Sequence, residues 1–221
     1  MKICIGIVSY LPESKIWEER LAAINSLLTD CSHYFPNIDI IIIAQNYKDY
    51  IPKSENNKII LYNYKEKLGI LGARKKLREI FINSDYDYLI MFDDDTHILG
   101  PIKNNFIETL ENNPDKFVCF DWDRGQLWLF AISKSLFKRI EYPESDPELG
   151  GVFEDIYLSR ICKYLCPEYI DSSKININRV QSRINSTWWD DKIYNIRTMV
   201  KNTENLIKND IKSKFSNNCL N

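Results

Sequence analysis

The stretch Tyr88-Leu89-Ile90-Met91-Phe92-Asp93-Asp94-Asp95 decides the fold, because an uninterrupted apolar run passes directly into three aspartates. A short continuous apolar run is typical of a strand that is buried on both faces of a parallel sheet. Open α/β sheets bind their ligands outside the carboxyl ends of such strands. We therefore interpret residues 88–92 as a buried strand and the three aspartates as a candidate site at its end.

Strand-like and helix-like segments alternate on both sides of this stretch. Before it, the sequence predicts strands over residues 2–8, 38–44 and 59–64 and helices over residues 15–28 and 69–81. After it, the sequence predicts strands over residues 117–120 and 127–132 and helices over residues 103–111, 133–140, 154–164 and 190–214. Such alternation is typical of the α/β class, with a mixed, mainly parallel central sheet flanked by helices and here a C-terminal helix.

Composition indicates one folded domain over residues 1–221. Hydrophobic residues make up 44% of the chain, which is enough for a large core and too much for a disordered protein. The 29 basic and 31 acidic residues give a net charge of −2, so no general positive field attracts nucleic acid. Nucleic acid is therefore not an expected partner, although the net charge does not exclude a local basic patch.

The location expected from the sequence is the cytoplasm. The apolar run at residues 3–8 is too short for a signal peptide, and no apolar run approaches the roughly 20 residues that cross a bilayer. The cysteines are scattered, without a CxxC pair, and we interpret them as buried thiols rather than disulfides. They are Cys4, Cys31, Cys119, Cys162, Cys166 and Cys219.

Three consecutive aspartates at the end of an apolar strand need a positive charge nearby, because like charges repel strongly in a partly dry site. A divalent cation, Mn²⁺ or Mg²⁺, would supply it, and these ions favour oxygen ligands from carboxylates, phosphates and water. In an extended chain Asp93 and Asp95 point to one side and Asp94 to the other. We assign Asp95, together with Asp93, to the metal; His97 is either a further ligand or a histidine outside the coordination sphere. The alternative is a solvated acidic turn.

These residues resemble the family-2 inverting glycosyltransferases of the GT-A fold, whose acidic DxD motif stands here as Asp93-Asp94-Asp95. The resemblance covers about residues 2–165. It implies that the loop after the first strand, with Ser9 and Tyr10, holds the nucleobase. Residues 68–74 are similar to the family's glycine-alanine-arginine stretch, which places Gly72 and Arg74 near the diphosphate together with Asp93 and Asp94.

The downstream segments extend the resemblance. Residues 127–137 are similar to the family's donor-side strand and the short helix after it, and residues 150–160 are similar to its "ED" segment. That segment implies Asp155 as the catalytic base, with Glu154 as the second choice. The implied contacts with the sugar or the acceptor are Asp121, Trp122, Trp128 and Trp188.

The resemblance implies a metal-dependent enzyme that transfers a sugar, with inversion, from a nucleotide-diphosphate sugar to an acceptor. A UDP-sugar is the favoured donor, and the acceptor is open among glycans, lipid-linked saccharides, peptides and other molecules. Residues 1–100 would form the nucleotide-binding half, 101–189 the acceptor and catalytic half, and 190–221 the C-terminal helix. The chain departs from the family where Lys75 follows Arg74 in place of a common asparagine.

Two other functions stay open. A sugar nucleotidyltransferase would carry a glycine-rich phosphate loop after the first strand, and residues 9–13 contain no glycine. A nucleotide-sugar-binding or degenerate GT-A module without catalysis is the other alternative, because a fold does not by itself fix an activity. At the level of single residues, Glu154 and Asp155 could only cap a helix, and Arg74 could be a solvent-facing helix residue.

Overall fold

The computed structural model describes the chain in seven ranges: 1–11, 17–98, 105–119, 129–143, 154–171, 180–182 and 196–215. Within these ranges seven strands form the main sheet. They are β1 (Ile3–Tyr10), β2 (Asp39–Gln45), β3 (Ile59–Tyr64), β4 (Tyr88–Asp93), β6 (Val118–Cys119), β7 (Leu129–Ser133) and β8 (Ile170–Asp171). Two further strands, β5 (Thr96–Ile98) and β9 (Val180–Ser182), pair antiparallel in a small second sheet.

The strand order of the main sheet is β3-β2-β1-β4-β7-β6-β8. Strands β3, β2, β1 and β4 run parallel, β7 is antiparallel to both of its neighbours, and β8 is parallel to β6. The mixed, mainly parallel α/β sheet that the sequence predicts is therefore confirmed. The chain builds outward from β1 to β3 and then returns to place β4 on the other side of β1, so the strand order reverses between β1 and β4.

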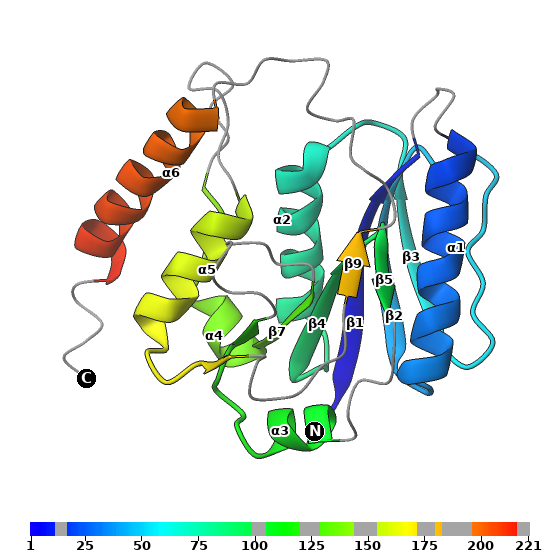
Figure 1. The fold of residues 1–221 in the computed structure, drawn as a ribbon, viewed down its shortest axis with the longest axis horizontal. Coiled ribbons are helices and arrows are strands. Elements are labelled where there is room, and N and C mark those ends of the chain that lie inside the picture. The colour runs from blue at the N-terminus through cyan, green and yellow to red at the C-terminus, as the bar shows by residue number, and fades with distance from the viewer. Residues whose placement is uncertain are drawn as a thin grey trace.

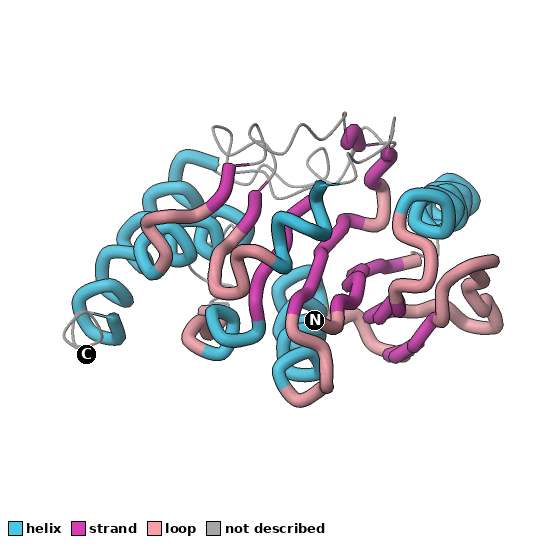
Figure 2. The backbone as a smooth tube through the Cα atoms, turned by 90° about the horizontal axis from the view of Figure 1, so that it is seen from below, coloured by secondary structure: helices cyan, strands magenta, loops and turns pink. Residues whose placement is uncertain are grey.

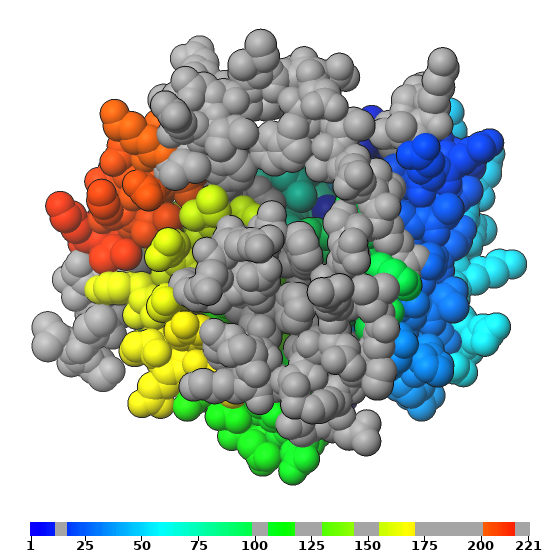
Figure 3. Space-filling model, viewed as in Figure 1, coloured from blue at the N-terminus to red at the C-terminus, as the bar shows by residue number. Residues whose placement is uncertain are grey.

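Helices cover both faces of the sheet, and Figure 2 shows them on either side of the strands. The helices are α1 (Trp17–Tyr34), α2 (Gly69–Ile82), α3 (Asn105–Glu111), α4 (Lys134–Lys138), α5 (Glu154–Leu165) and α6 (Ile196–Asp210), which continues as a π-helical turn, η5 (Ile211–Phe215). In the ribbon and space-filling views α1 and α6 lie on opposite flanks of the molecule (Figures 1 and 3).

Two buried clusters, one on each face, form the core. Helices α1 and α3 pack on one face, where Ile24 and Phe106 meet Ile90 of β4. Helices α2, α4, α5 and α6 pack on the other, where Leu77 and Leu158 meet Leu89, Met91 and their neighbours. Because alternate residues of β4 serve opposite faces, the strand must be apolar throughout, which is why its sequence shows no alternation.

A close approach between α2 and β1 depends on Gly6. A Cβ atom at this position would lie 2.8 Å from Cδ2 of Leu77 and 2.7 Å from Cδ1 of Leu89. Such distances are well below van der Waals contact, so any side chain at position 6 must displace one of these leucines. Gly6 therefore leaves room for the side chains of Leu77 and Leu89 between α2 and the sheet.

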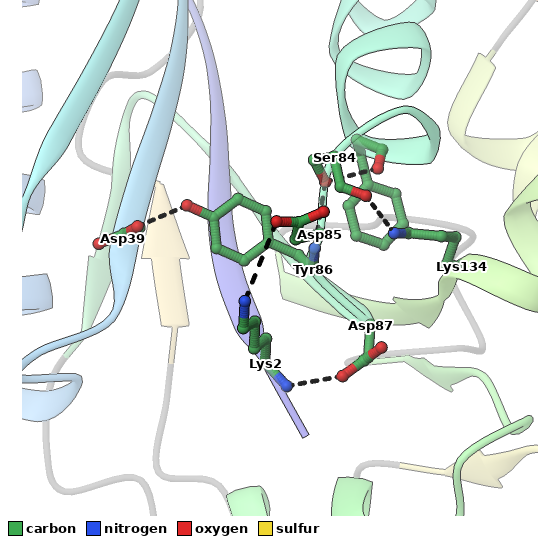
Figure 4. A network of polar contacts seen from close by, with 8 residues as sticks. Lys2, Asp39, Ser84, Asp85, Tyr86, Asp87 and Lys134 are labelled. Carbon is green, nitrogen blue, oxygen red and sulfur yellow. Dashed lines mark hydrogen bonds and ion pairs between the residues drawn. The ribbon is translucent and has the colours of Figure 1, made fainter.

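Polar contacts join the elements at the amino ends of the strands, and Figure 4 shows this network. The backbone N–H of Lys2 donates to Asp87 over 2.7 Å, and the Tyr86 hydroxyl donates to Asp39. Lys134 donates to the carbonyl oxygen of Ser84 over 2.6 Å. These contacts fix β1, β2 and β4 relative to α4 at the end of the sheet opposite the three aspartates.

Most predicted elements are present, with shifted ends. Helix α1 runs on to Tyr34, six residues beyond the predicted end, and β7 covers 129–133 where 127–132 is predicted. The predicted C-terminal helix at 190–214 is found as α6 and η5, whose described part begins at Ile196. Strands β5, β8 and β9 are not predicted, because runs of two or three residues carry no periodic signal.

Four of the cysteines agree with the expectation of thiols rather than disulfides. Cys4, Cys31 and Cys162 are buried, Cys166 is partly exposed, and these four form no disulfide. Within the described ranges, no helix has the length and apolar character needed to span a membrane.

The contact between Gly6 and Leu77 yields a prediction for folding. We expect Gly6→Ala to lower the free energy of unfolding by about 1–3 kcal/mol through overpacking and Leu77→Ala to lower it by about 2–5 kcal/mol through a cavity. Because the new methyl group at position 6 would occupy space left by Leu77, the double variant should lose less than the sum of the two, by about 0.5–3 kcal/mol. Urea denaturation of the four proteins measures this, and strict additivity would contradict it.

Candidate functional site

The three aspartates lie at the point where the strand order reverses. In the register of the sheet Val8 of β1 pairs with Asp93 of β4, and Tyr10 pairs with Gln45 of β2. The predicted nucleobase residues Ser9 and Tyr10 therefore end β1 beside the end of β4. The carboxyl ends of parallel strands at such a switch point are the usual ligand-binding crevice of open α/β sheets.

Asp94 is held by three donors. Its side chain is buried, and it accepts hydrogen bonds from the Ser9 hydroxyl over 2.7 Å and from the Arg20 guanidinium over 3.0 Å. The backbone N–H of Tyr10 also donates to it. Burial raises the pKa of the Asp94 carboxyl, while Arg20 and Ser9 lower it. Asp94 thereby joins the end of β1, helix α1 and the turn after β4.

Asp93 faces the opposite side of the sheet, where it meets Arg74 of α2. The guanidinium donates to the Asp93 carboxylate over 2.9 Å, and 34% of the Asp93 side chain remains exposed to solvent. Arg74 itself is only 3% exposed. The alternative of a solvent-facing arginine is therefore wrong, whereas a contact between Arg74 and a diphosphate stays a prediction.

Asp155, the predicted base, belongs to the same electrostatic cluster. Burial raises the pKa of its carboxyl, and the charge of Arg74 and the N–H of Ile156 act in the opposite direction. The N–H of Ile156 donates to the carboxylate over 2.8 Å, at the first turn of α5. Arg74 thus interacts with carboxylates from β4 and α5. Glu154, the second choice, is the first residue of α5.

Residues at the end of β2 and after β3 also contact one another and the end of β1. The Lys67 ammonium lies 4.9 Å from the centre of the Tyr10 ring, within the range of a cation–π contact. Asn46, which has a positive φ of 61°, donates from its side chain to the carbonyl oxygen of Leu11 over 2.9 Å. Gln45 is buried and accepts from the N–H of Leu68 over 2.8 Å.

The glycines of the predicted phosphate segment lie at the start of α2. Gly69, with a φ of 68°, adopts a backbone conformation that favours glycine. Gly72 lies one turn further, and a Cβ atom there would come within 3.3 Å of Cβ of Leu68. Gly72 therefore allows a close approach to its own preceding turn, and its contact with a diphosphate stays a prediction.

His97 lies in β5, one residue beyond Thr96 at the start of that strand. Its Nδ1 lies 3.0 Å from a carboxylate oxygen of Asp30 in α1, and the N–H of Ile98 donates to the same oxygen over 3.1 Å. This contact fixes the ring of His97 on the face covered by α1.

The remaining predicted substrate contacts lie outside the described residues. They are Asp121, Trp122, Trp128 and Trp188. Of the predicted site residues, the structure brings Arg74 together with Asp93 and Asp155, and the role of each stays a prediction.

Arg20 is the site residue that the sequence interpretation misses. A signal for it is present: Arg20 precedes Ile24 by four residues and so falls on the apolar stripe of α1, where a charged residue needs a buried partner. Gln45 and Asn46 carry no comparable signal, because their roles depend on the pairing of strands that are distant in sequence.

A cation would find oxygen ligands at Asp93 and Asp95, both of which are partly exposed, whereas Asp94 is buried. The described ranges contain no group of three or more His, Cys, Asp or Glu side chains arranged for a metal ion. Mg²⁺ and Mn²⁺ commonly bind one or two protein carboxylates and complete their coordination with phosphate and water. The donor atoms of Asp93 and Asp95 are of the kind that these ions prefer, and metal binding there stays a prediction.

A hollow of about 550 Å³ lies at the other end of the sheet, lined by residues that include Lys2, Asp39 and Tyr86. It adjoins the network of Figure 4, whose polar groups bond to one another. Because ligands of parallel sheets bind at the carboxyl ends of the strands, the cluster around Asp93 is the better candidate site.

Comparison with known proteins finds similar structures but no similar sequence. No protein-family model matches the sequence, and no curated protein matches it. The crystal structure of S. aureus TarS is similar, with a TM-score of 0.61 and 11% identity over 97% of this chain and 40% of that one. The structure of S. aureus TarS 1-349 in complex with UDP-GlcNAc gives 0.62 and 10% identity over 97% and 68% of the two chains.

This chain thus spans 40% of the length of the TarS chain. Over 97% of its length the chain shares its fold with these TarS structures. At 10% to 11% identity the likeness extends to the fold alone.

The buried carboxyl of Asp155 yields a prediction for stability. Because its pKa is raised in the folded state, the ionised form destabilises the fold above that pKa, and this cost disappears as the pH falls towards the ordinary value of 3.8. Asp155→Asn should therefore melt no lower than the unaltered protein at pH 8, with a difference that shrinks towards pH 4. Thermal melts across this range measure it, with the exposed Asp87→Asn as control; a large loss at pH 8 would contradict it.

Proposed function

We propose that the chain is a metal-dependent, inverting glycosyltransferase that takes its sugar from a nucleotide-diphosphate sugar, with a UDP-sugar as the favoured donor. The observation that carries the proposal is the meeting, at the switch point between β1 and β4, of Asp93, Arg74 and Asp155. The likeness to a TarS structure in complex with UDP-GlcNAc supports the choice of donor class. The proposal extends to a cytoplasmic location and leaves the acceptor open.

In the proposed reaction the bond between the anomeric carbon and the diphosphate oxygen breaks, and a bond forms from an acceptor oxygen to that carbon. Asp155 would take the proton of the acceptor hydroxyl, since its raised pKa makes it a stronger base than an exposed aspartate. Arg74 could exchange its contact with Asp93 for the phosphate oxygens, to which a guanidinium donates well.

Asp95, with Asp93, would hold the Mn²⁺ or Mg²⁺ ion. The bound ion would offset negative charge on the departing nucleoside diphosphate. Ser9 and Tyr10, at the end of β1, would contact the nucleobase. The sugar and the acceptor would then lie towards α5, where Asp155 is placed at the first turn.

The proposal predicts slow donor hydrolysis that depends on the base. We expect the protein to release nucleoside diphosphate from one of a panel of UDP-, GDP- and dTDP-sugars, and Asp155→Asn to lower this rate by about 100-fold or more, as loss of a general base does. Because the substitution keeps the fold, its nucleotide affinity should change little.

Asp87→Asn is the matched control, since Asp87 lies at the opposite end of β4 and is exposed. Nucleotide binding without turnover of any donor would instead support the non-catalytic binding module. Formation of a nucleotide-sugar from a sugar phosphate and a nucleoside triphosphate would support the nucleotidyltransferase.

The proposal also predicts that nucleotide binding depends on the cation. We expect titration calorimetry to show UDP binding in the presence of Mn²⁺ and at least tenfold weaker binding with EDTA. Asp95→Ala should abolish most of the difference between the two conditions, because it removes an oxygen ligand. Equal affinity with and without Mn²⁺ in the unaltered protein would contradict the assignment of a metal.

A further inference from the structure

We propose that Arg20 and Asp94 form a positioning pair that fixes the turn carrying Asp93 and Asp95 against the end of β1. The inference rests on the proposed function, because it gives this pair the task of aligning the metal-binding carboxylates with the nucleobase residues. It also removes Asp94 from the set of groups that contact nucleotide or metal.

The geometry separates Asp94 from its two neighbours. The side chains of Arg20 and Asp94 are 7% and 10% exposed, and their atoms lie 3.0 Å apart. Ser9 donates a second hydrogen bond to the same carboxylate, and the Tyr10 N–H a third. Three donors surround a buried carboxylate, which leaves it poorly placed to bind an ion from solution.

The contacts join three separate parts of the chain. Arg20 comes from the first turns of α1, Ser9 and Tyr10 from the last two positions of β1, and Asp94 from the turn that follows β4. In the proposed function the nucleobase residues and the metal-binding carboxylates lie on either side of this junction. The pair therefore sets the distance between the two sites that a nucleoside diphosphate must occupy together.

Stability alone is a poor reason for such a pair. A buried ion pair often contributes little, because desolvation of the two charges offsets their attraction, and replacing both partners with apolar residues of similar size can be neutral. Removal of one partner is costly, since it leaves a buried charge without compensation. This asymmetry allows positioning to be separated from stability by experiment.

The first test uses the ligand-free protein. We expect Arg20→Met alone to lower the melting temperature by about 10 °C and the double variant Arg20→Met with Asp94→Leu to recover part of that loss, because the buried charge is gone while Ser9 and Tyr10 still lack their acceptor. Amide hydrogen exchange should nevertheless speed up in the double variant at residues 9–11 and 93–96, by tenfold or more, because the carboxylate no longer accepts from Ser9 and Tyr10. Unchanged exchange in these two segments would overturn the proposal.

The second test measures function on the same proteins. We expect the double variant to bind UDP with Mn²⁺ roughly 10- to 100-fold more weakly than the unaltered protein, as loss of groups that orient metal ligands does. The matched control removes an exposed ion pair, Lys116→Ala with Glu168→Ala, which should leave affinity and exchange unchanged. Affinity of the double variant equal to that of the unaltered protein would overturn the positioning role.

The two tests separate this inference from the proposed function. If the unaltered protein binds no nucleotide with Mn²⁺, the proposed function fails, and with it the task given to the pair. The exchange experiment still decides whether Arg20 and Asp94 fix the turn.

Discussion

Neutralisation of adjacent carboxylates at the end of a buried strand is the constraint on which the rest of the structure depends. Because alternate residues of a strand face opposite sides, one arginine cannot serve both Asp93 and Asp94. Arg74 of α2 meets Asp93 on one face, and Arg20 of α1 meets Asp94 on the other. The acidic motif thereby attaches a helix to each face of the sheet at the end where the strand order reverses.

The fold was predictable from the sequence because its central elements carry strong local signals. The apolar run of β4 and the helical spacing of residues 69–81 each specify one structure by themselves. The antiparallel direction of β7 and the short strands β5, β8 and β9 were not predictable, because their pairing depends on partners far along the chain. The sequence also predicts too early an end for α1. The last turns of this helix, up to Tyr34, are stabilised by packing on the sheet, which a local pattern does not reveal.

The sequence predicted where the candidate site lies better than it predicted the role of each residue in it. The position of the aspartates after an apolar strand sufficed to place them at the ligand-binding end of a parallel sheet, and Asp155 is close enough to Arg74 for their charges to interact. Strand geometry separates Asp94 from Asp93 and Asp95, but the sequence could not show which side chain neutralises each of them, because Arg20 and Arg74 come from helices on opposite faces of the sheet. Arg20 lay among apolar positions and had no visible partner until the fold brought it to Asp94.

The close packing at Gly6 has a consequence for how variants of this protein are interpreted. The side chain of Leu77 packs over Gly6, where no Cβ atom blocks it. Leu77 lies one helical turn from Arg74 on α2. A side chain at position 6 would displace the side chain of Leu77, one turn from the guanidinium that donates to Asp93. In a mutational screen, substitutions at Gly6 would thus disturb the packing of the helix that carries Arg74, although Gly6 itself pairs with Met91, two residues before Asp93.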